Sequence, residues 1–169
     1  MAAARKSRTS LPYDVQVRVF RRDRWLCRWC RRPVVFAPAL RALEQLARER
    51  GHDGPLAYHD PRWRRDRAPL LDHLAAVVDH VEAYSRGGAH DESNFVTSCN
   101  KCNARKNNVV VEEFQRAVAA RTVKGRYGEP EHWDGLSTLF VLLARSGNVI
   151  LSAAERGWLA ALNSASMLP

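Results

Sequence analysis

An aspartate, a histidine and two asparagines follow one another at fixed spacing within residues 78–103, VDHVEAYSRGGAHDESNFVTSCNKCN. His80 is the candidate general base, because histidine titrates close to neutral pH and can accept a proton from water. Asp79 and Asn103 offer a carboxylate and an amide oxygen, a hard ligand set that favours Mg²⁺ or Mn²⁺. Phosphodiester hydrolysis requires an activated water and a divalent cation in fixed geometry, so it is the chemistry that these residues could perform.

The four cysteines of the chain form two Cys-x-x-Cys pairs with none left over: Cys27, Cys30, Cys99 and Cys102. Zinc takes four tetrahedral ligands, and a tight turn directs both thiolates of such a pair at one centre. The pattern therefore predicts one four-cysteine zinc site. A closed shell of thiolates leaves no position for water, so the ion should be structural. The alternatives are a redox pair or buried thiols without a metal.

The elements that must position these groups are two short strands and a helix, predicted over 74–81, over 95–97 and from residue 100 onward. Successive side chains of a strand face opposite sides, so Asp79 and His80 can share a site only where the strand is twisted or bulged. On the helix, Cys99, Cys102 and Asn103 lie at positions i, i+3 and i+4. One rigid turn would then serve the zinc site with its cysteines and the catalytic ion with Asn103.

The length of 169 residues requires only one domain. We predict a core of about residues 11–32 plus 70–115, an insertion over 33–69 that is partly loop, and a C-terminal helical tail over 116–169. Further helices are expected over 11–22, 38–50, 112–121, 136–144 and 153–162. Gly51 would end the second of these, and Ser152 with Glu155 would form a capping box at the start of the last.

Basic residues are concentrated near the N-terminus, where residues 1–32 contain ten basic and two acidic side chains. Arginine binds phosphate bidentately, so this distribution suits a polyanion, although a solvated face is an equal alternative. The candidate nucleic-acid contacts are Arg21, Arg22, Arg24, Arg28, Arg86 and Arg105. Tryptophans at positions 25, 29 and 63 lie among arginines. We expect them to pack in the core around the predicted zinc site rather than to stack on bases. The absence of long apolar runs predicts an intracellular, cytoplasmic protein with no membrane contact.

Four segments together resemble the HNH endonuclease family: RRDRWLCRWC, VDHVEAYSRGG, ESNFVTSC and CNKCNARKNN. The resemblance implies an α+β fold with a ββα-metal core and a structural four-cysteine zinc site, wrapped here by additional helices. It makes His80 the general base and Asp79 and Asn103 the ligands of the catalytic ion. Asn94 would keep the histidine and the strands in register, and Lys106 would approach the phosphate or the metal. Asn103 stands where the family name has a histidine.

The expected activity is divalent-metal-dependent hydrolysis of DNA, double-stranded DNA foremost, with Zn²⁺ as structural and Mg²⁺ or Mn²⁺ as catalytic cofactor. Two alternatives remain open: a non-catalytic zinc-stabilised module that binds nucleic acid, and a nuclease that acts on RNA or on structured DNA. A non-catalytic module would have no use for Asp79, His80 and Asn103 together. The C-terminal helices could contact a protein partner or form a homodimer.

Overall fold

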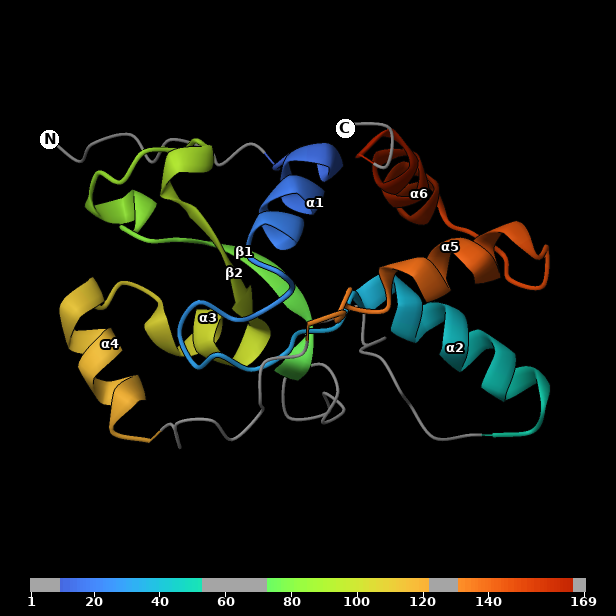
Figure 1. Ribbon diagram of the computed structural model, residues 1–169, viewed down its shortest axis with the longest axis horizontal. Helices are drawn as coiled ribbons and strands as arrows, with labels where there is room; N and C mark the ends of the chain where they lie inside the picture. Colours follow the sequence, from blue (N-terminus) through green and yellow to red (C-terminus); the bar gives the residue numbers. More distant parts are fainter. Residues whose placement is uncertain (1–9, 53–72, 122–130, 166–169) are drawn as a thin grey trace, which may run out of the picture.

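Two antiparallel strands and the helix that follows them form the centre of the fold, as the computed structural model of residues 10–52, 73–121 and 131–165 shows (Figure 1). β1 (Ala76–His80) pairs with β2 (Phe95–Cys99) in a continuous register from Ala76↔Cys99 to His80↔Phe95. α3 (Asn100–Lys106) begins directly after β2. The predicted α+β class and ββα core are confirmed. The loop predicted within the insertion lies almost entirely outside the described residues.

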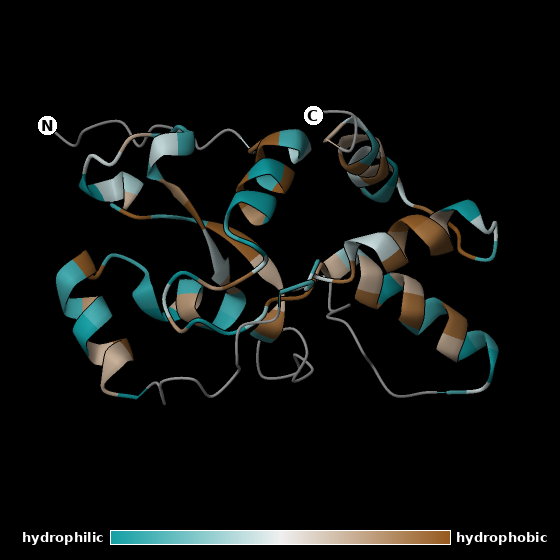
Figure 2. Cartoon of the chain, in the orientation of Figure 1, coloured by the Kyte–Doolittle hydropathy of each residue, from teal (hydrophilic) through white to brown (hydrophobic). Residues whose placement is uncertain are grey.

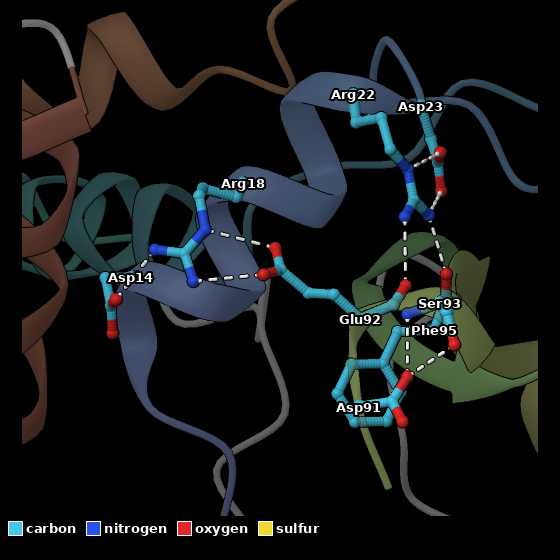
Figure 3. A network of polar contacts seen from close by, with 8 residues as sticks. All are labelled: Asp14, Arg18, Arg22, Asp23, Asp91, Glu92, Ser93 and Phe95. Carbon is cyan, nitrogen blue, oxygen red and sulfur yellow. Dashed lines mark hydrogen bonds and ion pairs between the residues drawn. The ribbon is translucent and has the colours of Figure 1, made fainter. Parts of the chain in front are cut away.

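α1 (Tyr13–Arg22) packs against both strands, and its buried residues are Val17, Val19 and Phe20. The chain leaves α1 at Asp23, whose Oδ2 accepts a hydrogen bond of 2.6 Å from the backbone N–H of Thr97 in β2. Arg22 donates to the carbonyls of Glu92 and Phe95 at 3.2 and 2.6 Å (Figure 3). These contacts place the segment that carries the first cysteine pair beside β2.

Three further helices lie together on the other side of α1: α2 (Ala37–Glu49), α5 (Ser137–Arg145) and α6 (Ala153–Ala165) (Figure 1). α2 packs on α5, and α6 packs on α1 and α5. The aromatic ring of Phe36 links the group, because it meets the rings of Trp25, Phe140 and Trp158 at centroid distances of 5.8, 5.3 and 5.2 Å. The helix predicted in the insertion and the two in the tail are thus present and pack with one another.

The predicted helix ends are also present. Gly51 follows α2 with a φ of +81°, and its N–H donates to the carbonyl of Arg48. At α6 the N–H of Ser152 donates to Glu155, whose own N–H donates to the hydroxyl of Ser152, at 2.8 and 3.2 Å. Local sequence determines such caps because both partners lie within one turn.

The remaining helix, α4 (Val111–Ala119), attaches through Phe114, whose ring meets that of Trp29 edge-on at 5.6 Å. Hydrophobic and hydrophilic residues alternate along α1 and α2 as expected for amphipathic helices (Figure 2). Within the described ranges, no helix has the length and apolar character needed to cross a membrane. Trp25 and Trp29 are buried, as the sequence predicts, and Trp63 falls outside the described residues.

Candidate active site and metal centre

The four cysteines converge on one point, and their sulfur atoms all lie within 4.8 Å of one another. The Sγ atoms of Cys30 and Cys99 are 3.9 Å apart. Four sulfurs at about 2.3 Å from a tetrahedral zinc ion lie about 3.8 Å apart, so the donor set and its spacing fit zinc. The predicted clustering is confirmed.

Local geometry builds the two halves of this centre. In the first half, Cys27 N–H donates to Arg32 and Arg31 N–H donates back to Cys27, at 2.8 and 2.9 Å, which closes a tight turn. In the second half, the N–H of Cys102 donates to the sulfur of Cys99 over 3.4 Å. The contact with Cys102 lowers the pKa of the Cys27 thiol to about 7, whereas the same contact with Cys27 raises the pKa of the Cys102 thiol.

A separate cavity of about 670 Å³ brings together three of the predicted site residues, Asp79, His80 and Asn103. Asp79 and His80 come from the end of β1 and Asn103 from α3. The cavity wall also includes Tyr84 and His90 from the loop between the strands. A carboxylate and an amide oxygen beside an imidazole in an open cavity fit a hard divalent cation completed by water and phosphate. The predicted constellation is therefore brought together in space.

β1 supplies both Asp79 and His80 without a bulge. The two residues pair in regular register with Val96 and Phe95, so the distortion expected from the sequence is absent from the pairing. Both nevertheless line the same cavity, whose wall continues past the end of the strand to Ala83. Because His80 is the last residue of β1, its side chain can reach the same cavity as that of Asp79, although neighbouring strand residues face opposite sides of the sheet.

Asp79 is held firmly, being only 8% exposed. Its Oδ2 accepts a hydrogen bond of 2.9 Å from the indole N–H of Trp29, and its Oδ1 lies 3.5 Å from Nζ of Lys106. Burial raises the pKa of the Asp79 carboxyl, and the charge of Lys106 and the indole donor oppose that rise. Trp29 lies between Cys27 and Cys30, so the segment that carries the first cysteine pair also holds this carboxylate.

Lys106 lies beneath β1 and is 1% exposed. Its ammonium donates to the carbonyl of His80 at 2.5 Å and lies 5.3 Å from the centroid of the Trp29 ring. From this position the ammonium faces protein, and its contacts hold the end of β1 and the carboxylate of Asp79. The approach of Lys106 to the phosphate or the metal stays a prediction.

Asn94 joins the two ends of the loop between the strands. Its Oδ1 accepts from the N–H of Glu82, and its Nδ2 donates to the carbonyls of Glu82 and Ala89, all at 2.8–2.9 Å. The loop passes so close that a Cβ added to Gly88 would lie 2.0 Å from the carbonyl oxygen of Glu82 and 2.9 Å from Nδ2 of Asn94. These contacts agree with the predicted role of Asn94 in register.

A second histidine, which the sequence analysis did not select, lies beside His80. Nδ1 of His90 is 3.1 Å from Nε2 of His80, and the two rings are nearly parallel, with centroids 5.3 Å apart. The sequence pointed to His90 only through its position two residues after Gly88, in the loop that Asn94 closes. A single histidine in a loop carries little information until its neighbours are known.

The predicted nucleic-acid contacts fall into two groups. Arg22 is bound to backbone carbonyls and to Asp23 (Figure 3), and Arg21 donates to the carbonyl of Leu162 at 3.4 Å. Four others are exposed, and no hydrogen bond or ion pair among the described residues involves their side chains: Arg24, Arg28, Arg86 and Arg105. The second group is available to a ligand.

The sequence model of the HNH endonuclease family matches residues 68–109. This range contains β1, β2 and α3, and it includes Asp79, His80, Asn94 and Asn103. The first cysteine pair and the helices of the insertion and the tail lie outside it. No curated protein and no solved structure matches the chain.

Proposed function

We propose that the chain, whose residues 68–109 match the HNH endonuclease family, is a divalent-metal-dependent endonuclease that hydrolyses DNA. The observation that carries the proposal is the single cavity lined by Asp79, His80 and Asn103. A base, a carboxylate and an amide oxygen on one wall supply the groups that the reaction requires. A module that only binds nucleic acid would not need them together.

Each residue has a separate task in this mechanism. His80 removes a proton from the attacking water. Asp79 and Asn103 would hold a Mg²⁺ or Mn²⁺ ion, which would stabilise the charge on the phosphate and on the departing 3′ oxygen. Asn94 keeps the loop closed, so that the end of β1 stays in place. The products would carry a 5′-phosphate and a 3′-hydroxyl group.

The exposed arginines would bind the phosphates of the DNA backbone. Arg86 and Arg105 are close in sequence to Tyr84 and Ala104, which line the cavity. Guanidinium groups bind phosphate oxygens bidentately and without regard to sequence, as a nuclease that holds the backbone requires. We take double-stranded DNA as the substrate.

The test compares two histidines, His80 at the end of β1 and His73 shortly before this strand. His80→Ala should abolish Mg²⁺- or Mn²⁺-dependent nicking of plasmid DNA, whereas His73→Ala, outside the residues that line the cavity, should leave it unchanged. Undiminished cleavage by His80→Ala would remove His80 as the base. Salt-sensitive DNA binding without cleavage under any divalent ion would favour the non-catalytic module. Sequencing the ends produced from mixed single- and double-stranded DNA and RNA would identify the substrate.

A further inference from the structure

His90 contacts the proposed general base directly. Its Nδ1 lies 3.1 Å from Nε2 of His80, the two rings are inclined by 20°, and both line the cavity that contains Asp79 and Asn103. We propose that His90 is a positioning residue that fixes the orientation and the tautomer of the His80 imidazole. This inference rests on the proposed function of His80.

The tautomer follows from the roles of the two nitrogens. A hydrogen bond between two neutral imidazoles needs one N–H donor and one lone-pair acceptor. Nε2 of His80 is hydrogen-bonded to His90. If His80 is the base, it therefore takes up the proton of the water at Nδ1. Nδ1 must then present a lone pair, so Nε2 carries the hydrogen and donates it to Nδ1 of His90. Which nitrogen acts as base is set by the hydrogen bond of the other.

The surroundings hold the ring of His90 in place beside His80. Its ring meets that of Tyr84 at 5.5 Å and that of Phe95 at 5.4 Å, both nearly edge-on. The preceding residue, Ala89, accepts a hydrogen bond of 2.8 Å from Asn94. Phe95 also meets the ring of His80, at 5.0 Å and 88°. The two imidazoles are therefore seated between the same loop and the start of β2.

Three substitutions separate the hydrogen bond from the packing. His90→Phe keeps a ring between Tyr84 and Phe95 but offers no acceptor, and His90→Ala removes both. His90→Asn can present an amide oxygen close to the position of Nδ1. We expect the Phe and Ala variants to lose about 10- to 100-fold in kcat, the range found when the partner that orients a functional side chain is removed. Asn should restore most of the activity, and KM for DNA should not change.

Two readouts test the inference independently of cleavage. In ¹⁵N–¹H spectra, His80 should carry its hydrogen on Nε2 in the wild type and lose this preference in His90→Phe. A His80 that carries its hydrogen on Nδ1 in the wild type would overturn the proposal, as would full activity of His90→Phe. Mn²⁺ affinity should be equal in the wild type and all variants, and a large fall would make His90 a metal ligand instead. If His80→Ala cleaves normally, the proposed function fails, while the tautomer still shows whether His90 positions His80.

Discussion

The hydrogen bond between Trp29 and Asp79 joins the segment of the first cysteine pair to a proposed ligand of the catalytic ion, and Trp29→Phe breaks it. The phenyl ring can still meet Phe114, but the donor to Oδ2 of Asp79, now at 2.9 Å, is lost. A hydrogen bond to a charged group contributes about 1.5–3 kcal/mol. Water cannot readily replace this donor, because Asp79 is only 8% exposed.

We therefore expect the lost hydrogen bond alone to lower the free energy of unfolding by about 2 kcal/mol, which for a chain of this length lowers Tm by about 4–8 °C, and the smaller ring adds a packing loss that the control variant shares. The substitution should also lower the affinity for the catalytic ion. Without the indole, Oδ2 of Asp79 can turn toward Lys106, which already lies 3.5 Å from Oδ1, and the carboxylate is drawn away from the cavity. Loss of a partner that orients a metal ligand costs about 10- to 100-fold in affinity, so Mn²⁺ should bind at least about 10-fold more weakly.

The matched control is Trp25→Phe. Trp25 is also buried and meets Phe20 and Phe36, but no hydrogen bond among the described residues involves its indole N–H. Both variants should lose stability, and only Trp29→Phe should lose Mn²⁺ affinity in a titration followed by electron paramagnetic resonance. Bound zinc should stay at one equivalent per chain in both. Wild-type Mn²⁺ affinity in zinc-loaded, folded Trp29→Phe would refute the link between the two sites.

Three further predictions concern the zinc, the arginines and the loop. The folded protein should contain one zinc per chain after exhaustive Mg²⁺ removal, and a strong chelator should lower its Tm; folded, metal-free protein of unchanged Tm would contradict this. Arg28→Ala should weaken DNA binding and reduce the salt slope by about 1, whereas Arg22→Ala should mainly lower Tm because that side chain binds backbone carbonyls; equal slopes in wild type and Arg28→Ala would exclude a phosphate contact. Gly88→Ala should lower the free energy of unfolding by about 1–3 kcal/mol, since its Cβ would overlap the carbonyl of Glu82. A calorimetric Tm equal to that of the wild type would show that the loop adapts.

Local sequence was sufficient for the elements and for the clustering of the four cysteines. The strands, the helices and the Ser152 cap depend on neighbouring residues, and two Cys-x-x-Cys pairs have few ways to combine. The positions of Trp29 and Lys106 depend on contacts across 50 and 26 residues, which no local pattern encodes. A lysine near the end of a polar helix predicts an exposed charge. Here its ammonium is buried, because the carbonyl of His80 and the carboxylate of Asp79 supply partners beneath the strand.

The same long-range contacts connect the proposed catalytic site to the four-cysteine centre. β2 ends at Cys99 and α3 carries Cys102 and Asn103, so a zinc ion on these cysteines would fix the helix turn that brings Asn103 to the cavity. The other half of the centre fixes Trp29 and, through its indole, Asp79. Each of the two proposed ligands of the catalytic ion is thus positioned by a different cysteine pair. A structural ion that performs no chemistry would then still determine the distance between them.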